Sequence, residues 1–132
     1  MDTKDQYLQM FFDESAEYLQ QLNENVLLLE EHPEDEEIIN AVFRAAHSVK
    51  GMSATMGYER LTDLTHRMES ILAKVRNKEM TINEFIIDTL FSGLDYIKLL
   101  LDDIRNNGEE RTDISDYLSK LEKILNNDIS IQ

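Results

Sequence analysis

Three residues near the middle of the chain have the types and the spacing that a reactive site on a helix surface would need. On a helical wheel of about 100° per residue, His47 lies roughly 140° from the centre of the apolar arc of its segment, so its imidazole should point outward. Lys50 follows on the same side. Gly51 lies one turn beyond His47 in mid-helix, where glycine costs about 1 kcal/mol relative to alanine. Such a glycine is explained if another molecule approaches the helix beside His47, or if a second helix of the chain crosses there.

A second pair of polar residues, His66 and Glu69, follows in the next helical segment at a spacing of three. Both fall off the apolar stripe, so we expect them to share an outer face. If the two segments are antiparallel neighbours joined near Gly57, the heights of His47 and Glu69 differ by only ~3 Å at about 1.5 Å rise per residue. The spacing therefore predicts a pair between His47 and Glu69, with Lys50 and His66 close by.

The chemistry of such a group is nucleophilic. A neutral imidazole has one protonated nitrogen and one nitrogen with a free lone pair. A carboxylate that accepts from the N–H fixes the tautomer and leaves the other nitrogen free to attack a phosphoryl group in line. Lys50 would offer positive charge to the phosphoryl oxygens, and Gly51 would leave room for an incoming active site.

Each of these signals has a simpler explanation when it is taken alone. A lone exposed histidine on a helix is usually a surface residue, and a His/Glu pair three residues apart is more often a weak surface contact than a site. His32, which precedes Pro33 in a turn, is interpreted as part of a connector without a role. The convergence of His47, Lys50 and Glu69 on one outer patch is what favours a site.

Five segments of the chain carry apolar residues at the period of an amphipathic helix, and no strand pattern or internal repeat competes with them. The pattern predicts an all-α fold, an antiparallel up-and-down four-helix bundle with an additional C-terminal helix beside it. The domain would cover residues 1–128, and residues 129–132 would begin a linker. The expected helices run from about 5 to 31, from 34–36 to 56, from 58 to 77, from 81–84 to about 106, and from 112–113 to 125.

Local signals mark the ends of these helices. Thr3 with Gln6 and Thr81 with Glu84 match capping boxes, in which the two side chains each satisfy a backbone donor that the helix leaves unpaired. Pro33 should end the first helix, because proline disfavours the helical conformation in the residue before it.

The composition excludes several classes of function. The formal net charge of −14, from 27 acidic and 13 basic residues, repels phosphate backbones, so we expect no nucleic-acid binding. These charges could suit a protein partner with a basic face, or simply keep the protein in solution. The absence of cysteine removes disulfides, zinc thiolates and cysteine nucleophiles. The N-terminus lacks the apolar core of a signal peptide, and no apolar run is long enough to cross a bilayer. A cytoplasmic monomer is the expectation.

The run from His47 to Gly57 resembles the histidine phosphotransfer signature H-x-x-K-G-x-x-x-x-x-G. The following run, Leu61 to Glu69, extends the match, and the longer form is similar to the N-terminal phosphotransfer domain of the chemotaxis histidine kinases of the CheA family. The motif covers about two dozen residues, and the helix layout extends the resemblance over nearly the whole chain.

The resemblance implies a role for each candidate residue. His47 would be phosphorylated on the nitrogen far from the backbone, and Glu69 would hold the opposite ring nitrogen. Lys50 and His66 would belong to the same polar network, and Gly51 would be the small residue beside the phosphoryl site. ATP and magnesium would be supplied by the ATP-binding domain of the kinase, with no cofactor or metal bound to this chain. The acceptors would be aspartates of response-regulator receiver domains.

This chain could not act as a kinase alone, because its four glycines form no nucleotide-binding motif. Three alternatives stay open at the level of sequence. The chain could be a free-standing phosphorelay carrier, or a helical interaction module without chemistry. It could also be a di-iron bundle, but that needs two Glu-x-x-His pairs facing the core, and the nearest match is a single Asp63-x-x-His66 on the outer face.

Overall fold

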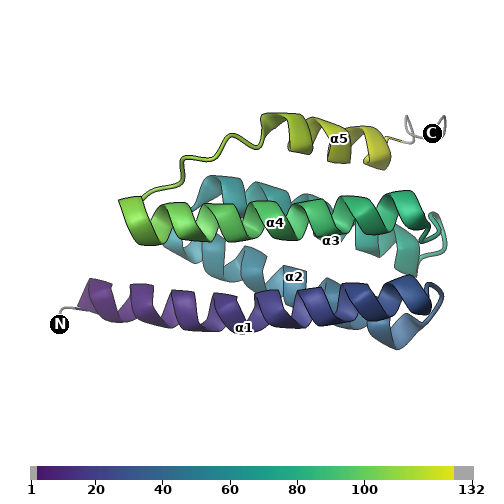
Figure 1. Cartoon of the computed structure of the whole chain (residues 1–132), viewed down its shortest axis with the longest axis horizontal. Helices are drawn as coiled ribbons and strands as arrows, with labels where there is room; N and C mark the ends of the chain where they lie inside the picture. Colours follow the sequence, from purple (N-terminus) through teal and green to yellow (C-terminus); the bar gives the residue numbers. More distant parts are fainter. Residues whose placement is uncertain (1–2, 127–132) are drawn as a thin grey trace.

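Helices α1 to α4 run alternately in opposite directions and form a four-helix bundle, and α5 lies against its outside (Figure 1). The computed structural model describes residues 3–126, so the expected start of a linker at 129–132 lies outside the described residues. Each bundle helix contacts two neighbours, in the ring α1–α2–α3–α4. The all-α architecture predicted from the apolar periodicity is confirmed. The helices are α1 (Thr3–Glu31), α2 (Glu36–Met56), α3 (Glu59–Arg76), α4 (Glu84–Asn107) and α5 (Ser115–Leu125).

The apolar stripes predicted for α3 and α4 are completely buried, whereas the stripe of α1 is buried only in part. Leu8, Phe12 and Leu19 of α1 keep intermediate exposure. The difference follows from the position of α5, which packs on α3 and gives that side of the bundle a second layer. Leu100 of α4 and Thr65 of α3, which fall beside the predicted stripes rather than on them, are fully buried as well.

Asp35 and Gly57 hold the two ends of α2. The Asp35 carboxylate accepts hydrogen bonds from the backbone N–H groups of Glu37 and Ile38, at 3.0 and 3.3 Å, which satisfies donors that the first turn leaves unpaired. Gly57 ends the helix with φ of 82°, a left-handed conformation that favours glycine. These two residues set the length and the register of the helix that carries His47.

Both capping boxes predicted from the sequence are wrong. Thr3 is already part of α1 rather than the residue before it. Asn83, not Thr81, caps α4, because its side chain lies close enough to accept from the N–H of Ile86 at 2.8 Å. Asparagine is as good an N-cap as threonine, and the spacing rule alone does not choose between two such residues so close in sequence.

Tyr117 anchors α5 to α4. Its hydroxyl donates a 2.6 Å hydrogen bond to the carbonyl of Thr89, and the side chain lies over Gly93. A Cβ atom at Gly93 would approach the Tyr117 hydroxyl to 2.5 Å and the Met68 sulfur to 3.0 Å. Gly93 is therefore the position at which the absence of a side chain allows α5 to dock.

The connection between α4 and α5 also caps α3. Glu110 accepts hydrogen bonds from the backbone N–H groups of Arg60 and Leu61, at 3.1 and 2.7 Å, in the first turn of α3. The residue at the N-cap of α3, Tyr58, has no side-chain hydrogen bond of this kind. A carboxylate from 50 residues further along the chain thus replaces the local cap and ties α5 to the helix that carries Glu69.

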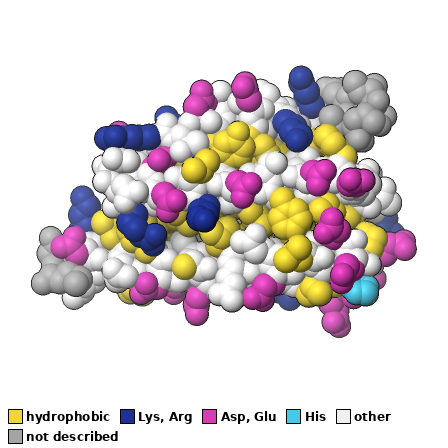
Figure 2. Space-filling model, viewed as in Figure 1, with side chains coloured by type: hydrophobic (Ala, Val, Ile, Leu, Met, Phe, Trp, Pro, Cys, Tyr) yellow, Lys and Arg dark blue, Asp and Glu magenta, His cyan; other side chains and the backbone are white. Residues whose placement is uncertain are grey.

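The face formed by α1, α4 and α5 carries many acidic side chains, with apolar groups in the grooves between helices (Figure 2). Within residues 3–126, none of the helices combines the length and the apolar composition that crossing a bilayer demands.

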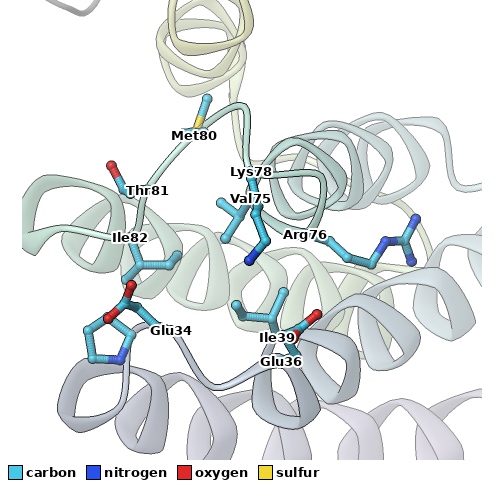
Figure 3. A pocket seen from close by; sticks show the side chains of 10 residues that line it. Glu34, Glu36, Ile39, Val75, Arg76, Lys78, Met80, Thr81 and Ile82 are labelled. Atoms are coloured by element: carbon cyan, nitrogen blue, oxygen red, sulfur yellow. The ribbon is translucent and has the colours of Figure 1, made fainter.

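A cavity of about 340 Å³ opens at one end of the bundle, between the α1–α2 and α3–α4 connections (Figure 3). Ile39, Val75 and Ile82 line it with apolar atoms. Arg76 contributes to the lining, but its guanidinium points away from the other labelled side chains, out of the cavity (Figure 3).

Candidate functional site

His47 lies in the middle of α2 and faces solvent, as its position on the helical wheel predicts. Its side chain is 63% exposed. The residues around it, Val42, Ala45, Ala46 and Val49, are buried and fix the rotation of the helix about its own axis. The imidazole points outward because the opposite face of α2 packs into the core.

Glu69 reaches His47 from α3. The Oε2 atom of Glu69 and the Nδ1 atom of His47 form a hydrogen bond. A carboxylate can only accept, so the imidazole donates from Nδ1 and its proton lies on that nitrogen. The Nε2 atom, which lies further from the backbone, then carries the free lone pair.

The position of Glu69 differs from the expectation in one respect. The residue is only 8% exposed, so it is buried rather than on an outer face. The reason is tertiary, because α2 packs against this side of α3 and places His47 and Lys50 over the carboxylate. A buried acceptor holds the imidazole against less competition from water than an exposed one would.

Lys50 completes the contact from the other side. Its ammonium donates a 2.7 Å hydrogen bond to the second oxygen of Glu69, Oε1. Burial alone would raise the pKa of the Glu69 carboxyl, but the hydrogen bonds from Lys50 and His47 and the charge of Lys50 outweigh it, so the pKa lies below its ordinary value. Glu69 therefore remains an ionised acceptor.

Gly51 is exposed and borders open space. A Cβ atom built on it would meet no atom within 4 Å outside its own helix backbone. This finding rules out one of the two explanations given by the sequence, because no helix of residues 3–126 crosses closely enough to require glycine. The remaining explanation is an approach by another molecule.

The structure does not bring His66 into the contact of His47, Glu69 and Lys50. His66 lies exposed on α3, and no side-chain hydrogen bond or ion pair within the described part of the chain joins it to His47, Lys50 or Glu69. Its place in the polar network stays a prediction.

Two neighbours of His47 were not singled out from the sequence. Phe43 and Arg44 line a shallow surface depression together with His47, Ser48 and Glu69. Phe43 lies one helical turn before His47, and this spacing of four is the signal that could have identified it.

The charge around His47 differs from that of the rest of the molecule. No aspartate or glutamate occurs between Glu37 and Glu59, although the chain carries 27 of them. The charged residues of this stretch are Arg44 and Lys50. The surface of α2 beside His47 can therefore accept an anionic group, whereas the face in Figure 2 is rich in carboxylates.

The remaining polar residues offer no comparable centre. Within residues 3–126, no three His, Asp or Glu side chains are grouped so that they could hold a metal ion. Glu69 is the one buried carboxylate among the described residues, whereas a di-iron bundle needs several in its core.

Comparisons with known proteins point to one family. Residues 6–107 match the Hpt domain family. The chain is 45% identical over 117 residues to the chemotaxis protein CheA of Bacillus subtilis, a match that covers 89% of this chain and 17% of that protein. The chain thus spans less than a fifth of the length of this curated relative.

Two solved structures share the fold of this chain over most of its length. The CheA phosphotransferase domain from Thermotoga maritima is 47% identical, with a TM-score of 0.73 over 76% of this chain and 95% of that one. The phosphorylated P1 domain of CheA3 from R. sphaeroides, solved in complex with CheY6, superposes with a TM-score of 0.86 over 93% of this chain and 98% of that one. At 19% identity, the second likeness concerns the fold alone.

Proposed function

The chain belongs to the Hpt domain family, as a phosphotransfer domain of the CheA type, and on this premise we propose that His47 is the residue that carries the phosphoryl group. The observation that supports this assignment is the pairing of an exposed imidazole with a buried, ionised carboxylate at Nδ1. Such a pairing leaves Nε2 both unprotonated and accessible, which a phosphoryl acceptor requires.

The proposed step forms one bond and breaks one. The lone pair of His47 Nε2 attacks the γ-phosphorus of ATP held by a separate kinase domain, and the bond from that phosphorus to the bridging oxygen breaks, so its electron pair leaves with ADP. The proton on Nδ1 stays in place throughout. The ring gains positive character as the N–P bond forms, and Glu69 stabilises that charge. Transfer to an aspartate repeats the displacement with the carboxylate as nucleophile.

Lys50 and the absence of carboxylates between Glu37 and Glu59 favour both encounters. ATP brings a polyanion, and an aspartate acceptor lies in an anionic site. A domain that presented the acidic face of Figure 2 would repel both. Lys50, bound to Glu69 but 26% exposed, keeps a positive charge beside the imidazole.

We also propose where the acceptor docks. A groove of about 270 Å³ between the start of α1 and the second half of α2 begins at Gly51, one turn from His47. Tyr7 and Met10 on its α1 side are 58% and 56% exposed, and Met52 lines its α2 side. The P1 domain of the R. sphaeroides relative was solved phosphorylated and bound to a response regulator, CheY6. A receiver domain in this groove would place its aspartate near Nε2.

The chain contains three histidines, and this allows a direct test. We would incubate wild type and the variants H32Q, H47Q and H66Q with the ATP-binding domain of a CheA relative, ATP and magnesium, and measure intact masses. We expect one acid-labile phosphoryl adduct on wild type, H32Q and H66Q, and none on H47Q. The relative's own phosphotransfer domain serves as the positive control for the donor.

Two results would refute the assignment. An adduct that persists in H47Q would place the phosphoryl group elsewhere. No adduct on wild type, while the positive control is phosphorylated, would instead indicate a helical interaction module without this chemistry.

A further inference from the structure

An aromatic ring lies next to the imidazole of His47 in a nearly parallel orientation. Phe43 precedes His47 by one turn of α2, and the two ring planes differ by only 5°, with centroids 6.4 Å apart. This separation and angle fall in the range of offset aromatic pairs. The ring of Phe43 is half-buried, whereas that of His47 is mostly exposed, so Phe43 is the better fixed of the two.

Phe43 is held in turn from the neighbouring helix. The guanidinium carbon of Arg76, the last residue of α3, lies 4.3 Å from the centre of the Phe43 ring. This distance is that of a cation–π contact. The Arg76 side chain points out of the cavity at the end of the bundle (Figure 3), so its guanidinium is available to contact the Phe43 ring.

The hydrogen bond to Glu69 cannot orient the imidazole by itself. It holds Nδ1, but coupled changes of the two side-chain torsions can still alter the ring plane while this contact is kept. In-line attack needs the Nε2 lone pair, which lies in the ring plane, to point at the phosphorus. A side chain that is 63% exposed has few other neighbours to set that plane.

We propose that Phe43 is a positioning residue that sets the ring plane of His47, and that Arg76 keeps Phe43 in place. The inference rests on the proposed role of His47 and adds a second constraint to the one supplied by Glu69. Glu69 determines which nitrogen is free, and Phe43 determines where that nitrogen points. In this role neither Phe43 nor Arg76 needs to touch the transferred group.

The test compares variants of this pair with variants of a similar pair elsewhere. F43L keeps an apolar side chain but removes the flat ring, and R76A removes the cation. The matched controls are F12L and R105A. The guanidinium carbon of Arg105 lies 4.7 Å from the centre of the Phe12 ring, which is the same kind of cation–π contact, but it joins α4 to α1 instead of α3 to α2. The kcat and KM of each variant, used as the substrate of a kinase domain with ATP, report chemistry and docking separately.

We expect F43L to lower kcat by about three- to tenfold with KM unchanged, since an aromatic pair of this kind contributes roughly that factor. R76A should act in the same direction and more weakly, and F43Y, which keeps the ring, should restore the rate. F12L and R105A should accept phosphate at the wild-type rate. Nuclear Overhauser contacts between the rings of residues 43 and 47 should weaken in R76A.

A second donor, phosphoramidate, separates orientation from intrinsic reactivity. This small molecule can reach Nε2 from any direction, so F43L should react with it at nearly the wild-type rate. Three results would overturn the proposal: an unchanged kcat in F43L, a rise in KM alone, which would make Phe43 part of a docking surface, or an equal loss with both donors. Failure of the assignment of His47 looks different, because wild type would then gain no phosphoryl group from the kinase domain.

Discussion

Replacing Gly51 by alanine should make the protein more stable and slower at the same time. The structure supports the first effect, because the added methyl group meets no atom within 4 Å. Alanine in mid-helix is favoured over glycine by about 1 kcal/mol, so the free energy of unfolding should rise by about that amount. For a domain of this size the corresponding rise in Tm is roughly 4 °C.

The second effect depends on the partner. The methyl group would occupy the space beside His47 that we assign to an incoming active site, and a misplacement of the reacting atoms by even 1 Å costs about a hundredfold in rate. We expect phosphoryl acceptance from a kinase domain to fall by at least about tenfold. Reaction with phosphoramidate should be unaffected, because a small donor does not need that space.

Urea unfolding followed by circular dichroism measures the stability, and single-turnover phosphorylation measures the rate. G57A is the matched control for the first measurement. Gly57 has φ of 82°, so alanine there is strained and should lower the stability by about 1 kcal/mol or more. The same substitution then changes the stability in opposite directions inside α2 and at the residue that ends it.

Either half of the prediction can fail separately. If G51A is no more stable than wild type, then the fold itself requires glycine at position 51, and the space beside it is not open in solution. If G51A is more stable but is phosphorylated at the wild-type rate, no partner approaches the helix at this position.

Four further variants test contacts at the site and in the packing of α3 and α5. E69A should slow phosphorylation of His47 by about ten- to a hundredfold without abolishing it, because the nucleophile remains while its tautomer is no longer held. The folded-state pKa of Glu69 lies below its ordinary value, so the ionised carboxylate contributes to stability at neutral pH, and this contribution is lost as the pH falls. The difference in urea midpoint between wild type and E69Q should therefore shrink from pH 7 to about pH 3. G93A should lower the free energy of unfolding by about 1–3 kcal/mol through the clash with Tyr117, and an unchanged value would mean that α5 can shift. E110A should cost about 1 kcal/mol in the same assay by removing the cap of α3. E109A serves as its control, because the exposed side chain of Glu109 pairs with Arg111 and makes no hydrogen bond or ion pair with α3 among residues 3–126.

Much of the fold could be predicted from the sequence because the bundle is built from local, periodic patterns. The stripes of α2, α3 and α4 identify buried residues such as Val42, Met68 and Leu90 without any knowledge of the partner helix. The outward direction of the His47 side chain follows in the same way, from the position of this residue relative to the apolar stripe of its own helix. The starts of the helices do not follow from the pattern in the same way, since the capping rule accepts both Thr81 and Asn83 and only the observed contact selects Asn83.

What the tertiary structure decided concerns pairs of residues on different helices. The antiparallel arrangement of α2 and α3 allowed the pairing of His47 with Glu69 to be predicted, but the burial of that carboxylate depends on how closely the two helices pack. The cap that Glu110 supplies to α3 and the contact of Arg76 with Phe43 have no signal in the sequence. Helical periodicity indicates which face of a helix is buried, but it does not indicate which side chain of another helix lies against that face. A reactive site consists of contacts between side chains from different helices, so its details depend on the tertiary structure.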